Sequence, residues 1–333
     1  MANLKIKKNI PLSQHTTFKI GGRAKYFFEA KINKEIIEAI AFAKENKVPF
    51  SVIGGGSNLL VSDNGYKGLV IKIKNSEVKI QDSGTEAEIL CGAGLPLAKL
   101  VQISLEKSLT DFEWAAGIPG TIGGAVYGNA GAFGKSIADE VKVVEVLEMR
   151  GQKNKIKNFE NKGCSFGYRE SIFKKRKNLI ILSSLFRLKK GSKEKIKKQI
   201  NKNLKYKKET QPLEFPSAGS IFKNFQGEIN NQKLINEFPE LQNFNEKRLI
   251  SAAYLIEKCG LKGKRIGNVK ISEKHANFIV NRGEGTAADV RKLIKRIQVA
   301  VFDRFRIILE PEVIFIGDFD EPLLEIGKVE GEK

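Results

Sequence analysis

The chain has 333 residues, of which 41% are hydrophobic, and its formal net charge at pH 7 is +20. This length favours two or three domains over a single core, and the composition is typical of a globular protein. Neither an apolar run of about 18 residues nor an apolar N-terminal segment occurs, so no membrane span or signal peptide is predicted. Three cysteines without a CxxC pair and two histidines support neither a disulfide framework nor a metal site. The cytoplasm is the expected compartment.

In the N-terminal part, the pattern predicts a turn at Gly21–Gly22 followed by a strand. Asn33 is expected to cap a helix over 34–45, in which apolar residues recur on one face. A short apolar strand then leads into the sequence GGGSN at 54–58. Successive N–H groups of such a loop can bind a phosphate, although a plain hairpin turn has the same composition. The glycine spacing is not the dinucleotide fingerprint, so a Rossmann domain is not favoured.

Strands are predicted over 68–74 and 87–91, and a helix from Pro96 to Leu105. The stretch Ala115–Gly134 then contains seven glycines, five alanines and no charged residue. Glycine lets a ligand or another backbone approach closely. We interpret the stretch as a wall of bare backbone against a large, flat, anionic ligand, and a close-packed turn region without a ligand is the alternative.

Two further strands, over 141–149 and 179–188, flank a turn-like segment at 164–171. The lysine-rich segment that follows predicts a surface helix over 192–208. Its apolar stripe is expected to consist of Ile196, Ile200 and Leu204. The positive charge makes nucleic acid a conceivable partner, but the lysines are spread along the chain and no recognised motif accompanies them. Anionic small ligands are the favoured explanation.

Two prolines in the segment 210–216 mark a boundary. Beyond it, we expect a helix over 249–258 ending at Gly260, a strand over 275–281, a helix from Thr286 to Phe305 and a strand over 307–317. Alternation along this last strand places Glu310 and Glu312 on the same face as aliphatic residues. Carboxylates in that setting are costly unless they are paired, face a ligand or lie at an edge.

Seven motifs occur along the chain in one order: GGGSNLLVSD (54–63), AAGIPGTIGGAVYGNAGAFG (115–134), SFGYRES (165–171), PSAGSIFKN (216–224), EKCGLKG (257–263), KHANFIVN (274–281) and LEPEV (309–313). In these motifs the chain resembles the UDP-N-acetylenolpyruvoylglucosamine reductase (MurB) family, over roughly residues 13–317. Several motifs in one order are more specific than any one of them.

The resemblance implies a cytoplasmic enzyme of peptidoglycan precursor synthesis that uses FAD and NADPH. It would convert UDP-N-acetylglucosamine enolpyruvate to UDP-N-acetylmuramate, with hydride passing from FAD N5 to C3 and a proton reaching C2. The expected partners are the UDP-sugar substrate and NADPH, with no nucleic acid and no membrane, and the expected state is a monomer.

The implied fold is α+β. It combines an FAD-binding domain of the vanillyl-alcohol oxidase and p-cresol methylhydroxylase type, in two subdomains, with a smaller α+β substrate-binding domain. The expected boundaries are 1–74 and 75–210 for the two subdomains, 211–318 for the substrate-binding domain and 319–333 for a loose acidic tail.

The resemblance also implies roles for individual residues. The FAD site would consist of Gly54, Gly55, Gly56, Ser57, Asn58, Ala116, Gly117, Pro119, Gly120, Gly123, Gly124 and Asn129. The substrate site would consist of Tyr168, Lys223, Asn224, Lys262 and His275. A compact ammonium such as that of Lys262 suits a phosphate, whereas His275 can equally be a core or capping histidine.

Three residues match the family's catalytic positions. Arg169 would stabilise the developing enolate, since a guanidinium stays charged, and its alternative role is a surface salt bridge. Ser220 would donate the proton to C2, which requires a charged setting because a free serine is a poor acid. Glu312 would act beside Arg169, and its choice over Glu310 rests on the resemblance alone.

Departures from the family pattern are few. Phe225 stands where proline is usual, Gly267-Asn268 replaces a common Gly-Gly, and no inserted tyrosine lid is evident between Arg169 and Ser220. Two other readings stay open: another flavin oxidoreductase on the same fold, such as a sugar oxidase, and a basic nucleic-acid-binding protein. A yellow flavin colour would distinguish both enzymes from a nucleic-acid-binding protein. NADPH oxidation that depends on the enolpyruvyl substrate would distinguish the reductase from another flavin oxidoreductase.

Overall fold

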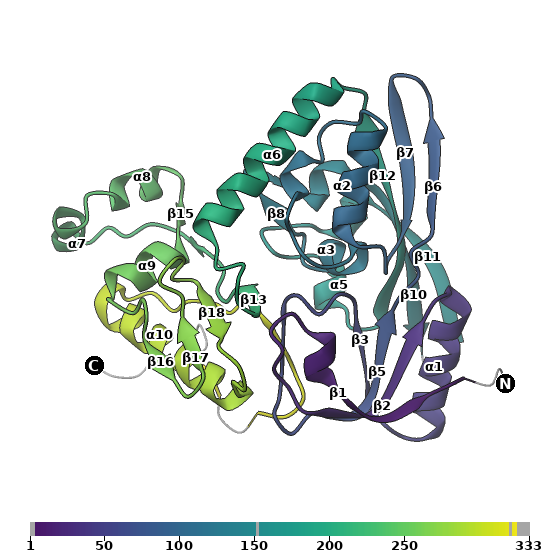
Figure 1. The fold of residues 1–333 in the computed structure, drawn as a ribbon, viewed down its shortest axis with the longest axis horizontal. Helices are drawn as coiled ribbons and strands as arrows, with labels where there is room; N and C mark the ends of the chain where they lie inside the picture. Colours follow the sequence, from purple (N-terminus) through teal and green to yellow (C-terminus); the bar gives the residue numbers. More distant parts are fainter. Residues whose placement is uncertain (1–3, 151–152, 320–321, 325–333) are drawn as a thin grey trace. The chain divides into compact units, whose positions relative to one another are not determined.

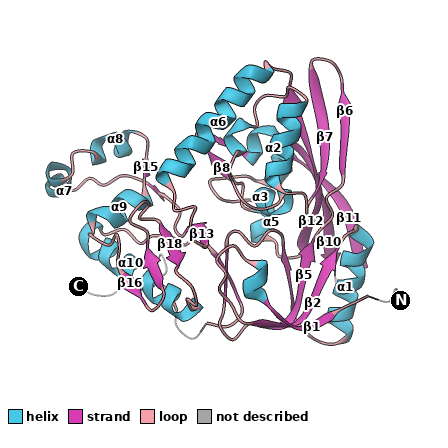
Figure 2. Cartoon of the chain, viewed as in Figure 1, coloured by secondary structure: helices cyan, strands magenta, loops and turns pink. Residues whose placement is uncertain are grey.

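The computed structural model describes residues 4–150, 153–319 and 322–324 (Figure 1). The described chain divides into two units. The first is built from the chain up to Ile10, from Ala24–Gly56 and from Lys67–Glu209. The second is built from Pro11–Arg23, Ser57–Tyr66 and the chain from Thr210 onward. Both units mix helices and strands (Figure 2), which confirms the predicted α+β class.

The first unit contains two sheets. A four-stranded sheet has the order β1 (Lys7–Pro11), β2 (Arg23–Ala30), β5 (Tyr66–Ile73) and β3 (Phe50–Ile53). A five-stranded antiparallel sheet has the order β11 (Lys153–Glu160), β10 (Val141–Arg150), β12 (Leu179–Lys189), β7 (Glu86–Gly92) and β6 (Val78–Asp82). Two short strands, β8 (Gly131–Ala132) and β9 (Lys135–Ser136), pair with each other.

Helices complete the first unit, and their apolar faces join one core with both sheets. Figure 1 shows α2 and α3 beside β7 and β12. The helices are α1 (Asn33–Glu45), α2 (Leu97–Glu106), α3 (Ile122–Tyr127), α4 (Ile137–Glu140), α5 (Ile172–Lys175) and α6 (Lys193–Thr210). Two 3₁₀ turns, η2 (Glu113–Ala115) and η3 (Asn161–Cys164), lie in this unit, and η1 (Leu12–His15) lies in the second.

The second unit is organised around the helix α10 (Ala287–Phe305), which packs on α9 (Ala252–Lys258) and on strands of a four-stranded sheet. That sheet has the order β13 (Ser217–Ser220), β18 (Phe278–Asn281), β17 (Val269–Ile271) and β16 (Arg265–Ile266). Two further strand pairs belong to the second unit: β4 (Leu59–Val61) is parallel to β19 (Ile314–Ile316), and β14 (Phe225–Gln226) pairs with β15 (Leu249–Ile250). The unit also contains the short helices α7 (Gln232–Glu237) and α8 (Leu241–Glu246).

Distant segments of the sequence meet inside the second unit. The Asp63 carboxylate accepts hydrogen bonds from the backbone N–H groups of Ala287 (2.8 Å) and Ala288 (2.9 Å), at the start of α10. The predicted cap Thr286 also binds this end, because its hydroxyl accepts from Asp289 N at 3.1 Å. A carboxylate and a hydroxyl thus satisfy the N–H groups that a helix leaves unpaired at its N-terminus.

Two helix starts differ from prediction. Ile32, not Asn33, precedes α1, and the Glu35 carboxylate reaches back to the N–H of Lys31 at 2.6 Å. The helix predicted over 249–258 begins at Ala252, because residues 249–250 pair with β14 and Ser251 then supplies the cap. In both places a hydrogen bond from another residue fixes the boundary that composition alone placed one to three residues away.

The strands predicted over 275–281 and 307–317 are shorter than expected, covering 278–281 and 314–316. Pro311 lacks a backbone N–H and cannot extend a ladder, and the residues around it bond one by one to 221–223. Lys223 N donates to Glu310 O, and Glu312 N donates to Ile221 O at 2.7 Å. Glu310 and Glu312 therefore lie beside 221–223 and outside the continuous strand predicted for them.

The apolar stripe predicted on α6 is also partly wrong. Ile196 and Ile200 are buried, but Leu204 is 42% exposed. The buried stripe continues instead through Asn203 and Lys207. Two polar residues occupy buried positions here because the backbone they face carries carbonyl groups that accept their N–H donors.

Candidate active site

The stretch Ala115–Gly134 takes a backbone path that few residue types allow. Gly117, Gly120 and Gly134 have φ values of 73°, 118° and 78°, in the region that glycine adopts without strain. Asn129 and Phe133 also have positive φ, at 43° and 54°. Gly117, Pro119 and Gly124 are exposed. The stretch therefore exposes glycine backbone at 117 and 124, and it also exposes the side chain of Phe133, which is 47% exposed.

The glycine loop at 54–56 packs directly on this wall. A Cβ atom on Gly54 would lie 2.3 Å from Thr121 Oγ1, and one on Gly55 would lie 2.9 Å from Gly120 Cα. Both distances are too short for a side chain, so the loop needs glycine for close approach. Packing alone thus explains these two glycines, which is the alternative that composition left open.

One buried hydroxyl lies at this junction. Thr121 is 8% exposed, and within residues 4–150, 153–319 and 322–324 its Oγ1 has no hydrogen-bond partner. Buried polar atoms in native proteins are normally satisfied, so this hydroxyl is a position where a water or a ligand can supply the partner. Exposed glycine backbone, the 54–56 loop and this hydroxyl together fit a large polar cofactor such as FAD.

Arg169 lies in a strained turn of the first unit that several contacts hold in place. Its φ is 56°, a value uncommon for a residue with a side chain. Its Nη2 donates to the Gly131 carbonyl at 2.9 Å, and its guanidinium lies 5.2 Å from the Tyr168 ring centroid. The Lys174 ammonium donates to the Arg169 carbonyl at 3.0 Å. Arg169 thus contacts the wall through its guanidinium.

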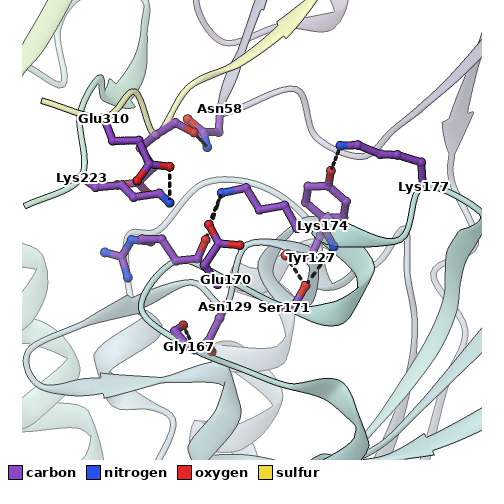
Figure 3. Close-up of polar contacts among 12 residues, drawn as sticks. Asn58, Tyr127, Asn129, Gly167, Glu170, Ser171, Lys174, Lys177, Lys223 and Glu310 are labelled. Carbon is purple, nitrogen blue, oxygen red and sulfur yellow. Dashed lines mark hydrogen bonds and ion pairs between the residues drawn. The ribbon is translucent and has the colours of Figure 1, made fainter. Parts of the chain in front are cut away.

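Asn129 belongs to the wall and was predicted to bind FAD, but its side chain binds the turn that contains Arg169. Its Nδ2 donates to the Gly167 carbonyl at 2.8 Å and its Oδ1 accepts from Ala138 N at 3.0 Å (Figure 3). The Ser171 hydroxyl donates to the Tyr127 carbonyl at 2.7 Å in the same region. Because both ends of the Asn129 amide contact protein, the structure gives this residue a positioning role for the Arg169 turn.

In the second unit, the strand β13 and the segment 309–313 bring four predicted residues together. Ser220 is half-buried and ends β13, beside Phe278 of β18. The backbone of Ile221 and Lys223 binds that of Glu312 and Glu310, as described above. Asn58, from a third segment, also binds Glu312, because the Asn58 Nδ2 donates to the Glu312 backbone carbonyl at 3.0 Å.

Lys223 is the most buried cation of this group, at 7% exposed. Its Nζ lies 2.6 Å from Glu310 Oε1, and Figure 3 shows the two side chains directed toward one another. The pairing lowers the cost of burying the ammonium. Glu310 is thus an ion-pair partner of Lys223, and the backbone of Glu312 is held by Ile221 and Asn58.

Lys262 and His275 form a second cluster in the same unit. The Lys262 ammonium lies 2.8 Å from Glu257 Oε2. Burial lowers the pKa of His275, and the charge of Lys262 lowers it further while Glu257 opposes the change. His275 Nδ1 accepts from Asn277 N at 3.3 Å, so the ring is fixed in a local turn. This histidine caps backbone and lies near a cation, which combines the two readings of the sequence.

Asn224 and Phe225 prepare the start of α9. The Asn224 Oδ1 accepts from Ala252 N at 3.1 Å, and Phe225 pairs with Ile250 in the β14–β15 ladder. Phe225, which stands where proline is usual in the family, thus pairs in a short ladder. Of the predicted substrate residues, Asn224 has a clear structural role in the protein itself.

The structure adds one buried cation, Lys207, that the sequence prediction assigned to a solvated helix face. Its ammonium donates to the Ala116 carbonyl of the wall at 2.7 Å. The available signal was the spacing of buried residues on α6, which recur at 196, 200, 203 and 207. Extending the stripe by this period predicts burial at 207.

Comparison with known proteins decides the family. The chain is 40% identical over 328 residues to UDP-N-acetylenolpyruvoylglucosamine reductase of Caldicellulosiruptor saccharolyticus, covering 98% of this chain and 96% of the relative. The chain belongs to the UDP-N-acetylenolpyruvoylglucosamine reductase family. A second reductase of this name, from Caldanaerobacter subterraneus subsp. tengcongensis, is 39% identical over 94% of both chains.

Two domain families and one solved structure agree with this membership. The C-terminal domain of UDP-N-acetylenolpyruvoylglucosamine reductases matches residues 211–316, and an FAD binding domain matches residues 24–156. The crystal structure of UDP-N-acetylenolpyruvylglucosamine reductase (MurB) from Thermus caldophilus is similar, with a TM-score of 0.72 and 30% identity over 94% of this chain and 100% of that one. The expected FAD-binding domain and its reductase-type C-terminal domain are thereby confirmed.

The matches leave the three-domain boundaries as a prediction. The described part of the chain contains no helix of the length and apolarity needed to cross a membrane. Most of the predicted acidic tail, residues 320–321 and 325–333, lies outside the described residues. Leu324 within it exchanges two hydrogen bonds with Gln298 of α10, at 3.1 and 3.2 Å.

Proposed function

We propose that this protein reduces UDP-N-acetylglucosamine enolpyruvate to UDP-N-acetylmuramate, with FAD as its bound cofactor and NADPH as its reductant. The observation that carries the proposal is the near-full-length match to reductases of this name. NADPH enters as the reductant that the family resemblance implies.

FAD, when bound, supplies the hydride that passes from NADPH to C3 of the enolpyruvyl group. The chain's part is to bind the cofactor with Gly54, Gly55, Gly56, Ser57 and the wall residues Ala116, Gly117, Pro119, Gly120, Gly123 and Gly124. Asn58 and Asn129 stabilise the residues that act on the substrate, by the hydrogen bonds described above. The orphaned Thr121 hydroxyl is a further donor for the cofactor.

Arg169 would stabilise the negative charge that develops on the enolpyruvyl carboxylate. A guanidinium remains charged at all relevant pH values and offers a fork of donors. Its Nη2 is bound to the Gly131 carbonyl, which fixes the direction of the fork. A fixed cation stabilises developing charge without having to reorganise during the reaction.

Ser220 would donate the proton that C2 receives, and solvent would then restore the hydroxyl proton. Glu312 would act on the substrate as a further catalytic residue, as the family resemblance implies, whereas Glu310 pairs with Lys223. General acid catalysis of this kind typically contributes about 10²- to 10⁴-fold to the rate. The half-buried Ser220 and the backbone-anchored Glu312 have the fixed placement that such a contribution needs.

Lys223, Lys262, His275, Asn224 and Tyr168 would bind the UDP-sugar substrate. Lys223 and Lys262 each carry one carboxylate partner, at 2.6 and 2.8 Å, and an ammonium can bind a phosphate oxygen at the same time. We further propose that the protein is a cytoplasmic monomer of the form without a tyrosine lid. The segment 170–219 is taken up by α5, β12 and α6.

The test is an absorption spectrum of the purified protein with NADPH and then substrate. We expect bound flavin, its bleaching by NADPH, and NADPH consumption that depends on the enolpyruvyl substrate. Equal consumption without that substrate would favour another flavin oxidoreductase, such as a sugar oxidase. A colourless protein that retains nucleic acid would contradict both enzyme readings.

A further inference from the structure

Lys207 is unusual among the lysines of α6. Eight lysines lie between Lys193 and Thr210, and Lys207 alone among them is buried, with 5% exposure. Burying an ammonium costs several kcal/mol unless charges or hydrogen bonds compensate it. Burial lowers the pKa of Lys207 to about 8, so the ammonium form still dominates at pH 7.

The contacts of Lys207 within the described chain include no carboxylate. Its Nζ donates to the Ala116 carbonyl at 2.7 Å and lies 5.8 Å from the centroid of the Phe133 ring. Gly117 lies against its stem, since a Cβ there would be 3.2 Å from Lys207 Cδ. An ammonium has three N–H donors, and one carbonyl uses only one of them. Both Ala116 and Phe133 belong to the neutral wall.

Anchoring the wall does not by itself require a charge. One turn earlier on α6, Asn203 Nδ2 donates to the Glu113 carbonyl at 2.8 Å. This neutral amide and Lys207 bind carbonyls on either side of the short turn η2, in equivalent positions four residues apart on the helix. An amide at 207 could make the same kind of bond at a lower desolvation cost.

The wall contains no charged residue, but cationic side chains from other segments of the chain donate hydrogen bonds to its carbonyl groups. Arg169 donates to the Gly131 carbonyl near one end, and Lys207 donates to Ala116 near the other. The proposed function assigns Arg169 to the substrate, and it leaves Lys207 without a role. A cation on the backbone that would hold the flavin ring stabilises whichever form of the ring carries more negative charge.

We propose that Lys207 is a cofactor-tuning residue: its buried positive charge, held on the Ala116 carbonyl, favours reduced over oxidised FAD in this site. The inference rests on the proposed function, because it requires FAD at the wall. Reduction adds negative charge to the flavin ring, so a nearby cation raises the midpoint potential of the bound cofactor. Lys207 then makes reduction by NADPH more favourable without touching the substrate.

The test is the midpoint potential of bound FAD, measured by spectroelectrochemistry in the holoenzyme and in Lys207→Gln, Lys207→Arg and Lys208→Gln. Gln keeps a donor for Ala116 and removes the charge, Arg keeps the charge, and Lys208 is the exposed neighbour on the same helix. We expect Lys207→Gln to weaken the preference for reduced FAD about tenfold, a fall of about 30 mV for a two-electron couple. Lys207→Arg and Lys208→Gln should stay near the wild-type value.

A merely structural role gives a different pattern. If Lys207→Gln binds FAD less tightly or melts earlier but keeps the wild-type potential, the tuning role is wrong. If all three variants share one lowered potential, the charge at 207 is not the cause. Wild-type protein that binds no FAD would overturn the proposed function itself, whereas equal potentials in FAD-loaded proteins overturn only this inference.

Discussion

At the scale of single residues, Glu310 and Glu312 show how neighbouring carboxylates acquire different tasks. Glu310 lies 2.6 Å from the buried Lys223, whereas Glu312 is held through its backbone by Asn58 and Ile221. The first carboxylate is paired with a buried cation, and the backbone of the second residue is fixed from two other segments. The proposed function gives the catalytic role to Glu312, two residues further along the chain.

We therefore expect Glu312→Gln to lower kcat far more than Glu310→Gln. Loss of Glu310 weakens the hold on Lys223, so its main effect should be a higher KM for the UDP-sugar substrate. Steady-state kinetics of the two variants separate these effects, with retained FAD as the check on folding. Equal losses of kcat would show that the pair is misassigned.

Ser220→Ala should keep FAD and its reduction by NADPH but slow the step in which substrate reoxidises the flavin. The expected loss is about 10²- to 10⁴-fold, the usual range for a general acid. Stopped-flow absorbance follows the two half-reactions separately. Ser217→Ala, on the same strand, is the matched control, and normal reoxidation in Ser220→Ala would remove Ser220 from the mechanism.

Motifs in the sequence proposed residues for the site, but they did not indicate which contacts hold those residues in place. Nothing in the sequence indicates that the Asn129 amide binds the Arg169 turn, or that Asn58 binds Glu312 from 254 positions away. Composition identifies residues with suitable chemistry, whereas long-range hydrogen bonds decide which of them position others. His275 illustrates the limit, since its ring both caps a turn and lies near Lys262.

At the scale of elements, Glu148 on β10 joins two strands and a helix. It is 1% exposed and is bound by Lys157 of β11 (2.7 Å), Arg150 (2.7 Å) and Arg176 at the end of α5 (2.8 Å). Hydrogen bonds from Lys157 and Arg150, with a smaller one from Arg176, lower the pKa of Glu148 from its ordinary value to about 2. The carboxylate thus stabilises the folded sheet in its ionised form.

This pKa shift sets a pH window for a stability measurement. A carboxyl group with a lowered folded pKa contributes stability above its unfolded value of 4.5, and loses that contribution as pH falls toward about 2. Glu148→Gln should therefore destabilise the protein at pH 7, and the difference from wild type should shrink between pH 4.5 and 2. Denaturant unfolding measures both, with the exposed Glu77→Gln as control. A pH-independent difference would contradict the ion-pair explanation.

Predictions for elements succeeded where local chemistry decides and failed where distant contacts decide. Thr286 capped α10 as expected, because a cap acts within four residues. The segment 307–317 was predicted as one strand, but Pro311 and bonds to residues 221–223 divide it. Leu204 was placed inside by its hydrophobicity, whereas the carbonyl groups of Glu113 and Ala116 select Asn203 and Lys207 for burial.

At the scale of the whole molecule, the net charge of +20 favours the approach of anionic ligands, and the proposed substrates, a UDP-sugar and NADPH, are both anionic. A field of one sign raises the association rate of opposite charges, and salt screens it. We expect kcat/KM for both substrates to fall as ionic strength rises from about 0.01 to about 0.3 M, while kcat changes little. Steady-state assays with viscosity held constant check this. Unchanged kcat/KM would show that the charge does not steer these ligands.

The second unit draws on three separate pieces of chain, and this has a consequence during synthesis. Phe18, Ile20 and Leu60 are at most 2% exposed in the folded unit, but the partner strand of Leu60, β19, leaves the ribosome about 250 residues later. At about 5–20 residues per second, that delay is roughly 10 to 50 seconds. The first unit is already complete at Glu209, whereas the apolar segments Pro11–Arg23 and Ser57–Tyr66 still wait for the rest of the second unit. Such segments are binding points for a cotranslational chaperone.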